Sequence, residues 1–351
     1  MKILHVIWTF LNGGVETMLI NVANEQIKLG YDVSILIVNN EMDYNLVNAL
    51  NKNVNVIAIN RKKGSKSILP LLKLNYKYLR LKPDITHFHF YNISDLFLLK
   101  NNSKWICTIH TTIVKDNFYR NKIDSYIAIS NIVKEKIEKI KKDINVTLCY
   151  NGIDFNKIKV KKQFNNEIKR IVCVGRLEFN LKGQDTIIDA FKLLKNQGCN
   201  IELDIIGHGS DFQKLNELIT ENNLGNQIKV LGNQSNSYVL NSLAKYDAFI
   251  QASRHEGFGL TVVEAMASCL PTILSSVDGH IEISENGKLT KLFEVNNSTN
   301  LCTTILDLNK NYKFEISKLN TIKNNVTNKY SIELMVRNLK NEYLQMLEKD
   351  I

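Results

Sequence analysis

The stretch that decides the fold is KILHVIWTF (2–10), LNGGV (11–15) and ETMLINVANEQIKL (16–29), closed by Gly30. An apolar run of strand length leads through a glycine-containing turn into a helical pattern. A second apolar run, DVSILIV, follows at 32–38. A strand, a turn and a helix at this spacing predict the first part of a parallel, Rossmann-like sheet.

The same alternation continues through both halves of the chain. In the first half, further strands are expected at 54–59, 85–88, 105–109, 126–129 and 146–148. In the second half, strands are expected at 170–174, 201–206, 228–231, 248–251 and 272–275, with helices at 186–196, 211–221, 237–244 and 260–268. At about 150 residues per domain, this predicts an α/β protein with two Rossmann-like, doubly wound domains. We place the boundary in the lysine-rich segment 154–169, which gives domains 1–165 and 166–330.

The charge of the chain differs between its two halves. The 351 residues carry a net charge of +10. Residues 1–170 hold 27 Lys and Arg against 14 Asp and Glu, whereas residues 171–351 hold 18 against 21. A basic half can face anionic lipid or a phosphorylated acceptor. No helix-turn-helix, zinc-finger or RNA-recognition signature accompanies the charge, so we expect no nucleic-acid partner.

Cysteine usage and the apolar runs favour a cytoplasmic protein. Six cysteines are scattered without a C-x-x-C pair, so neither a disulfide framework nor a zinc site is indicated. No apolar run approaches the length of about 20 residues that crosses a bilayer. The first residues lack the apolar core and the cleavage site of a signal peptide.

The strongest local motif is SRHEGFGLTVVEAMA at 253–267, between an expected strand and an expected helix. Gly257 and Gly259 let the backbone approach a ligand closely, and the amide groups at the start of the helix suit an anion. The alternative interpretation is structural. In that case the motif is a glycine turn followed by a core helix with two solvated glutamates, Glu256 and Glu264.

Charged and glycine-rich turns follow other expected strands. Gly175-Arg176 and Lys182-Gly183 follow the first strand of the second half, where two cations can clamp a diphosphate. Gly207-His208-Gly209 and Gly232-Asn233 can form the walls around a flat ring such as a nucleobase. Gly13-Gly14 is not part of a G-x-G-x-x-G sequence, so a nicotinamide fingerprint is not supported. Each turn can also be an ordinary strand-to-helix connection.

Histidines gather in the first half without the usual partners of a metal site. His87 and His89 flank Phe88 at strand spacing, and His110 ends a strand. No cysteine or carboxylate accompanies them, and no Asp-x-Asp occurs in the chain, so we expect no metal ion. We expect His87 to be a satisfied core residue and His110 to be placed to meet a substrate.

Taken together and in this order, the motifs resemble glycosyltransferase family 4, the retaining nucleotide-sugar enzymes of the GT-B fold. The diagnostic element is Glu-x7-Glu, here Glu256 and Glu264, within EGFGL and EAMA. The resemblance extends from residue 2 to about residue 330. The supporting motifs are Gly13-Gly14, Asp84-x-x-His87-x-His89, His110, Asn151-Gly152-Ile153-Asp154, Gly175-Arg176, Lys182-Gly183, Gly207-x-Gly209 and Gly279-His280-Ile281-Glu282. The chain departs from the family pattern at His208, Ser210 and His280.

The resemblance implies an enzyme that moves a sugar from a nucleotide-diphosphate donor, with UDP as the expected nucleotide, to a glycan or lipid-linked acceptor in polysaccharide synthesis. Arg176 and Lys182 would bind the diphosphate and stabilise its growing negative charge, so neither a metal nor another cofactor is required. Glu264 would bind the ribose hydroxyls, Glu256 would contact the donor sugar, and His110 would lie beside that sugar.

The resemblance also implies a wider donor site in a cleft between the two domains. Backbone groups of the motif helix and of the glycine turns would surround the donor. The donor-binding residues implied are Gly13, Gly14, Gly207, Gly209, Asn233, Gly257, Phe258, Gly259, Leu260 and Glu264. A C-terminal helix, 331–351, would cross back onto the first domain.

In this family the first domain receives the acceptor and often lies on a membrane. Two basic amphipathic stretches, 66–80 and 132–142, are therefore candidates for binding an anionic surface, at about 1 kcal/mol per basic residue. The alternative is that both helices pack their apolar faces on the sheet and leave their lysines in solvent. The expected location is the cytoplasm, on the inner face of the membrane if these stretches bind it.

Other classes of function fit the sequence less well. A nucleotide-sugar epimerase or hydrolase on the same fold needs further acids in the cleft, and only the glutamate pair is evident. A non-catalytic nucleotide-sugar-binding scaffold has no reason to retain Arg176, Lys182 and Glu264 together. The sequence leaves open the sugar, the base, the acceptor, the linkage and the oligomeric state.

Overall fold

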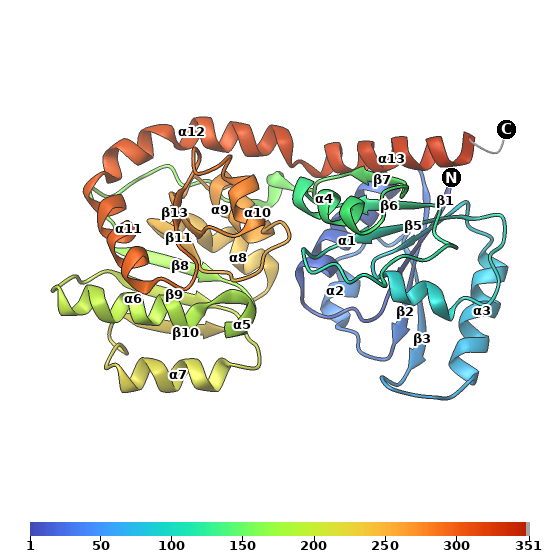
Figure 1. Cartoon of the computed structure of the whole chain (residues 1–351), viewed down its shortest axis with the longest axis horizontal. Helices are drawn as coiled ribbons and strands as arrows, with labels where there is room; N and C mark the ends of the chain where they lie inside the picture. Colours follow the sequence, from blue (N-terminus) through green and yellow to red (C-terminus); the bar gives the residue numbers. More distant parts are fainter. Residues whose placement is uncertain (349–351) are drawn as a thin grey trace. The chain divides into compact units, whose positions relative to one another are not determined.

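The computed structural model of the protein describes residues 1–348, which divide into two compact units (Figure 1). Unit 1 is Met1–Ile153 with the segment that starts at Tyr330, and unit 2 is Asp154–Lys329. The division therefore falls about twelve residues before the boundary expected from the sequence. The segment 154–165 lies with unit 2 because Lys161 donates a hydrogen bond to Tyr246 O (2.6 Å) and forms an ion pair with buried Asp247 (3.2 Å).

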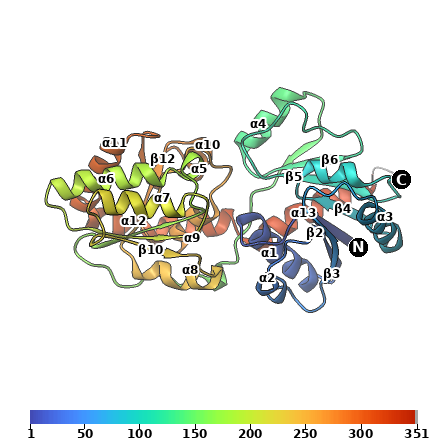
Figure 2. The same ribbon diagram turned by 90° about the horizontal axis from the view of Figure 1, so that it is seen from below.

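Unit 1 contains a seven-stranded sheet in the order β3-β2-β1-β4-β5-β6-β7, seen from two directions in Figures 1 and 2. All neighbouring strands are parallel. The strands are β1 (Lys2–Ile7), β2 (Asp32–Asn39), β3 (Asn55–Arg61), β4 (Ile85–Phe88), β5 (Lys104–Ile109), β6 (Ser125–Ala128) and β7 (Val146–Leu148). The helices are α1 (Gly14–Lys28), α2 (Tyr44–Asn48), α3 (Leu69–Leu81), α4 (Asn131–Ile140) and α13 (Ile332–Glu348), with the 3-10 turn η1 (Tyr91–Leu96).

The first strand–turn–helix forms as expected, but with tighter bounds. The strand expected at 2–10 ends at Ile7, because the chain then leaves the sheet and Phe10 N donates to Glu41 O (3.0 Å). Helix α1 begins at Gly14, earlier than the expected Glu16. Its buried side chains, Leu19 among them, pack on the sheet in one apolar cluster. Each such side chain contributes about 1.5–3 kcal/mol on burial.

The C-terminal helix α13 is part of unit 1. The two carboxylate oxygens of Glu342 accept hydrogen bonds from Ser125 Oγ (2.6 Å) and Thr147 Oγ1 (2.8 Å), next to β6 and β7 (Figure 1). Gly152 is required for this packing, because a Cβ there would lie 2.7 Å from Ile332 Cα. Residues 349–351 of the helix expected from the sequence lie outside the described residues.

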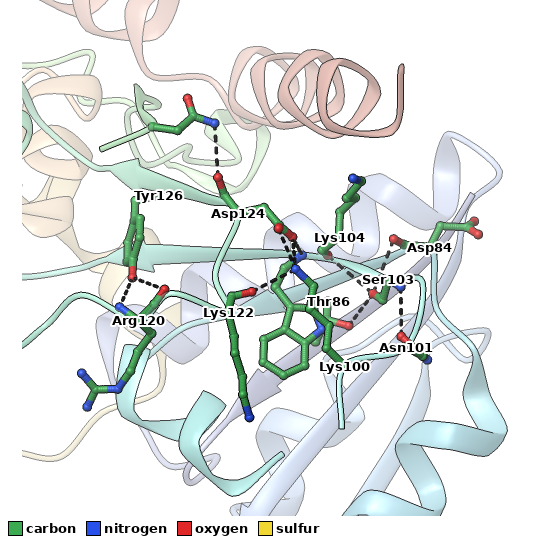
Figure 3. Close-up of polar contacts among 12 residues, drawn as sticks. Asp84, Thr86, Lys100, Asn101, Ser103, Lys104, Arg120, Lys122, Asp124 and Tyr126 are labelled. Atoms are coloured by element: carbon green, nitrogen blue, oxygen red, sulfur yellow. Dashed lines mark hydrogen bonds and ion pairs between the residues drawn. The ribbon is translucent and has the colours of Figure 1, made fainter. Parts of the chain in front are cut away.

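A polar cluster closes the amino-terminal edge of β5 and β6 (Figure 3). Asp124, immediately before β6, accepts hydrogen bonds from Lys100 Nζ (2.6 Å) and from Trp105 N (2.7 Å). Ser103, immediately before β5, shares a hydrogen bond of 2.7 Å with Thr86 of β4. These contacts stabilise the strand entrances, whereas ligands of parallel sheets bind at the opposite, carboxyl ends.

The two basic amphipathic stretches differ in burial. Helix α4 buries Val133 and Ile137, and the stretch 132–142 has no exposed large apolar side chain. In contrast, α3 and the residue before it expose several apolar side chains, namely Ile68, Leu69, Leu72, Tyr76 and Leu79. The structural alternative therefore describes 132–142 but not 66–80. None of the helices within residues 1–348 has the length and apolar character needed to cross a bilayer.

Unit 2 contains a six-stranded parallel sheet in the order β10-β9-β8-β11-β12-β13. The strands are β8 (Arg170–Val174), β9 (Glu202–Ile206), β10 (Ile228–Gly232), β11 (Ala248–Gln251), β12 (Thr272–Ser275) and β13 (Lys291–Phe293). The helices are α5 (Phe179–Lys182), α6 (Gln184–Asn196), α7 (Phe212–Glu221), α8 (Asn236–Ser242), α9 (Leu260–Ala267), α10 (Asp278–Ile283), α11 (Ser298–Lys310) and α12 (Tyr312–Lys329), with 3-10 turns η2 (Phe155–Lys157) and η3 (Leu243–Lys245). Strand β13 and helix α5 are too short to produce a periodic pattern, so the sequence did not predict them.

Candidate active site

The topological switch point of unit 2 lies between β8 and β11, which are neighbours in the sheet. In a doubly wound sheet, the connections after two such strands leave on opposite faces, and their carboxyl ends frame a ligand site. The loop 175–183 follows β8, and the loop 252–259 follows β11. The charged residues expected from the sequence, Arg176, Lys182 and Glu256, all lie in these loops or in the short helix α5.

An ion pair joins the two loops. Lys182 Nζ lies 2.6 Å from Glu256 Oε2, with both side chains mostly buried, and Ser253 Oγ donates to the same oxygen at 3.2 Å. Burial by itself raises the pKa of Glu256, but the charge of Lys182, followed by that of His280, outweighs burial and lowers it. The glutamate is therefore ionised, and Lys182 is fixed at the carboxyl ends of β8 and β11.

Glycines allow the loops to come this close. Gly183 has φ +62°, and a Cβ there would lie 2.1 Å from Ala252 O. A Cβ on Gly279 would lie 2.5 Å from Glu256 O. Gly207, with φ +151°, and Gly209 approach the turn after β8 in the same way, at 1.9 Å from Gly175 O and 2.2 Å from Leu177 O. At all four positions the close neighbour is protein backbone.

An arginine that sequence reasoning did not single out stabilises the site. Arg254 forms a two-point ion pair with Asp185 (2.9 and 2.8 Å) and also donates to Phe179 O. Its backbone N donates to Leu181 O (2.8 Å). These contacts fix α5, and with it Lys182, against the loop after β11. The signal was available, because Arg254 lies within the strongest motif.

A buried histidine lies behind Glu256. His280 of α10 is fully buried, and its Nδ1 donates to Ser275 O at 3.0 Å. Ser275 Oγ in turn donates to Ser253 O at 2.6 Å. Burial lowers the pKa of His280 to about 4, although the negative charge of Glu256 opposes this. His280 is therefore neutral and supports the loop without adding charge to it.

The second glutamate of the motif is buried in α9, one turn from the helix start. Glu264 is 6% exposed, and Gly259 begins the helix with φ +90°. Burial raises the pKa of Glu264 to about 8, with a hydrogen bond from Asn236 acting in the opposite direction. The alternative of a solvated surface glutamate is therefore wrong for Glu264. Its carboxyl group is protonated at neutral pH and can both donate and accept a hydrogen bond.

Arg176 differs from Lys182 in that its charged group is exposed. Its side chain is 65% exposed, and Glu178 lies 3.9 Å away. Its backbone is held, because Gln184 Nε2 donates to Arg176 O at 2.8 Å. The guanidinium group is therefore anchored at the site but able to reorient.

The remaining expected donor-site residues of unit 2 occupy loop and helix-start positions. Asn233 directly follows β10. Gly257 precedes the buried Phe258, and Leu260 is the first residue of α9. The first-turn amides of α9 point out of the helix start, where a positive partial charge accumulates.

In unit 1, the expected residues lie around a second switch point, between β1 and β4. Gly13, with extended backbone, precedes α1, and Gly14 is its first residue. His89 follows β4 and His110 follows β5, and His89 Nδ1 lies 3.2 Å from His110 Nε2. The glycine turn and His110 therefore occupy the carboxyl ends of the unit 1 strands.

One cluster within residues 1–348 has the residue types of a metal site, and it lies in unit 1. Nitrogen atoms of the buried His5, His87 and His89 lie within 4.8 Å of one another. All six of their ring nitrogens already have protein partners at 2.7–3.2 Å. The residues therefore do not fit a resident metal ion without the loss of these hydrogen bonds.

Two parallel, Rossmann-like sheets with side chains gathered at their switch points define the GT-B class of fold. Solved structures share it. TarM of S. aureus, in complex with Fondaparinux, alpha-GlcNAc-glycerol and UDP, has a TM-score of 0.83 at 15% identity, covering 97% of this chain and 99% of TarM. HepE of Anabaena, in complex with UDP and glucose, has a TM-score of 0.81 at 17% identity and covers 97% and 99%. At these identities the likeness shows the fold alone.

The family follows from the sequence comparison. The family model described as Glycosyl transferases group 1 matches residues 154–329, and that described as Glycosyltransferase Family 4 matches residues 12–157. The chain belongs to the glycosyl transferases group 1. It is similar to an uncharacterized glycosyltransferase of Methanocaldococcus jannaschii, at 30% identity over 243 residues. That match covers 66% of this chain and 61% of the relative, so it spans less than two thirds of the relative's length.

Proposed function

We propose that this protein transfers a sugar from a nucleoside-diphosphate sugar, with uridine as the base, to a hydroxyl group of a glycan or lipid-linked acceptor. The product belongs to a cell-surface polysaccharide, and the anomeric configuration is retained. The observation that carries this proposal is the Lys182–Glu256 pair, held at the switch point beside the start of α9. The UDP in the TarM and HepE structures supports uridine as the base.

The proposed chemistry is electrostatic. The bond between the anomeric carbon and the diphosphate breaks, and its electron pair stays on the phosphate. The acceptor oxygen bonds to the same face of that carbon, and its proton passes to the leaving phosphate. Lys182 and Arg176, with the first amides of α9, stabilise the growing negative charge. One preplaced donor of this kind is worth about 100- to 1,000-fold in turnover.

Glu256 has two parts in this proposal. In the absence of ligand it keeps Lys182 in place. With the donor bound, an ammonium group has three protons, so Lys182 can bind the diphosphate and Glu256 together. The second carboxylate oxygen of Glu256 accepts a hydroxyl of the donor sugar. Glu264 binds the ribose hydroxyls, and His110 lies beside the sugar.

The donor set also supports a reaction without a metal ion. Lys182 and Arg176 are cations, and a divalent cation on the diphosphate needs carboxylate oxygens instead. We therefore expect full activity in EDTA. Turnover that disappears with EDTA and returns with Mg²⁺ or Mn²⁺ would overturn this part of the proposal.

A thermal-shift screen tests the donor. A ligand at about 100 times its Kd adds about 2.7 kcal/mol to the stability of the unit that binds it. UDP and UDP-sugars are expected to raise the melting temperature, and GDP and ADP are not. Arg176→Ala and Glu264→Ala are expected to abolish the shift, whereas Lys214→Ala, on the outer surface of α7, is the matched control. No shift with any nucleotide would remove the nucleotide-sugar donor from the proposal.

The acceptor side of the proposal rests on α3. Exposed apolar residues, among them Leu69 and Leu72, are interspersed with Lys66, Lys77 and Arg80 on the same stretch. A basic amphipathic surface of this kind binds anionic lipid. We propose that it attaches the protein to the inner face of the cytoplasmic membrane, where a lipid-linked acceptor is presented.

Liposome co-sedimentation tests this attachment. Replacing Lys66, Lys77 and Arg80 by Gln is expected to weaken binding to anionic liposomes by about fivefold per residue, at about 1 kcal/mol each. The matched control replaces Lys134, Lys139 and Lys142 by Gln, in and after α4, where the apolar residues are buried. Equal losses in both variants would indicate net charge alone, and no loss in either would exclude α3 as the attachment surface.

A further inference from the structure

The four histidines of unit 1 form parts of one buried polar network, and three of them form a continuous chain. His110 Nε2 lies 3.2 Å from His89 Nδ1. His89 Nε2 lies 3.1 Å from His5 Nδ1, and His5 Nε2 lies 2.8 Å from Gln26 Oε1 in α1. The chain therefore runs from the core side of α1, through β1, to the carboxyl end of β5. The three rings also stack, with centroids 5.3–5.5 Å apart.

The fourth histidine forms a separate branch. His87 Nδ1 lies 2.7 Å from the hydroxyl of Tyr343 in α13, and its Nε2 lies 2.7 Å from Thr108 Oγ1. Because both partners are hydroxyl groups, either nitrogen of His87 can carry the proton. The His87 branch therefore has no fixed direction, unlike the chain that ends on Gln26.

The direction of the chain is set by Gln26. Its Oε1 can only accept, so His5 must carry its proton on Nε2 and leave Nδ1 bare. His5 Nδ1 must then accept from His89 Nε2–H, which leaves His89 Nδ1 bare. By the same step, His110 must donate through Nε2–H, and its Nδ1 is left without a proton. Each ring passes the constraint to the next.

The orientation of the Gln26 amide supports this direction. Its Nε2 has no acceptor at hydrogen-bonding distance, but the amide interacts with the hydroxyl of Tyr343 and opposes the rise that burial causes in the pKa of Tyr343. An N–H group facing the phenolic oxygen has that effect. The oxygen of the amide therefore faces His5.

The chain also requires neutral rings, and burial provides them. Burial lowers the pKa of His5 to about 4 and that of His110 to about 3, and it holds the pKa of His89 well below its usual value. A charged ring would place two N–H groups opposite each other within the chain. At neutral pH each histidine therefore carries one proton, and only its position is to be decided.

We propose that Gln26, His5 and His89 act as positioning residues that hold His110 in the Nε2–H tautomer, so that His110 presents a bare Nδ1 as a hydrogen-bond acceptor at the carboxyl end of β5. Within residues 1–348, His110 makes its one hydrogen bond to His89. Its other nitrogen is thus available to a ligand. A group bound there must donate, as a sugar hydroxyl does, whereas a carbonyl or phosphate oxygen is rejected. This choice of ligand group rests on the proposed function, but the tautomer does not.

Nitrogen NMR of the ligand-free protein tests the tautomer directly. In protein labelled with ¹⁵N-histidine, two-bond proton–nitrogen correlations distinguish Nε2–H from Nδ1–H rings. We expect His5, His89 and His110 to be Nε2–H between pH 6 and pH 8. Gln26→Met, which keeps the side-chain length but removes the accepting oxygen, is expected to give a mixture of both tautomers at all three. Thr108→Val is the matched control, because it changes only the His87 branch.

Several outcomes would overturn the proposal. They are an Nδ1–H tautomer for His110 in the unsubstituted protein, an unchanged single tautomer in folded Gln26→Met, and a stoichiometric metal ion bound to the histidines. If Gln26→Met does not fold, the spectra of the unsubstituted protein and of Thr108→Val still decide. In turnover, Gln26→Met is expected to raise KM for the sugar nucleotide by about two- to tenfold, the worth of one hydrogen bond, without changing the Kd of the free nucleotide. A tautomer found as expected with no change in KM would leave the positioning chain intact and refute the sugar contact of His110.

Discussion

Glu264→Gln is the substitution that most directly tests how the site is built. Glutamine keeps the volume of the side chain and two polar atoms, but it cannot ionise. In the folded protein, burial raises the pKa of Glu264 to about 8 from its ordinary value of 4.5. The folded state therefore binds this proton more tightly than the unfolded state does. As a consequence, the stability of unit 2 falls as the pH rises from 4.5 to 8.

The size of the effect follows from the shift. Each unit of pKa difference corresponds to about 1.4 kcal/mol. Between pH 6 and pH 8, the unfolded state has already lost the proton and the folded state is losing it, so the cost of Glu264 grows by about 2 kcal/mol. Glu264→Gln lacks this cost. The free energy of unfolding of the variant relative to the unsubstituted protein should therefore rise by about 2 kcal/mol across that range.

Urea unfolding, followed by circular dichroism and by hydrogen exchange of unit 2 peptides, measures this difference. Both tryptophans, Trp8 and Trp105, belong to unit 1, so tryptophan fluorescence follows the other unit. Glu221→Gln, an exposed carboxyl in α7, is the matched control and should give a constant difference. If the curves of Glu264→Gln and of the unsubstituted protein stay parallel from pH 6 to pH 8, Glu264 is not the buried, protonated acid described above.

Three other outcomes follow from the same contacts. Nucleotide binding at pH 7 should release about one proton, because ribose hydroxyls favour the ionised form of Glu264; calorimetry in two buffers of different ionisation enthalpy measures this, and equal heats would contradict it. Lys182→Met should reduce turnover by about 100- to 1,000-fold and lower the melting temperature by leaving an unpaired carboxylate. Adding Glu256→Gln should recover the melting temperature but not the turnover, and a failure to recover would refute the pairing. Gly207→Ala should destabilise unit 2 by about 2–4 kcal/mol in urea unfolding, because its Cβ would meet backbone, whereas Gly198→Ala, at a positive φ in open space, should cost about 1–2 kcal/mol; equal costs would refute the steric argument.

Much of the fold is local information and could be predicted from the sequence. An apolar run, a glycine turn and an amphipathic stretch are each a few residues long, and their repetition predicts parallel sheets without any knowledge of contacts. The same holds for the motif at 253–267, whose residues lie on one strand–loop–helix connection. Short elements such as β13 were missed, because three residues carry no periodicity.

Pairings across the sheet could not be predicted in this way. Lys182 and Glu256 are 74 positions apart, and they meet because β8 and β11 are neighbours at the switch point. Burial is equally a property of the whole unit. The sequence allowed Glu264 to be a solvated acid, and only the packing around α9 removes its solvent and raises its pKa.

The histidines show the division most clearly. The sequence alone determined that His87 and His89 share one side of a strand and that His110 ends another. It contained no sign that His5 and Gln26 belong with them, since those residues lie 84 and 63 positions before His89 along the chain. The parallel order β1-β4-β5 aligns the strand ends, and α1 packs Gln26 beneath them. A hydrogen-bond chain depends on distances of about 3 Å between atoms, and only the tertiary structure sets distances between residues so far apart in the sequence.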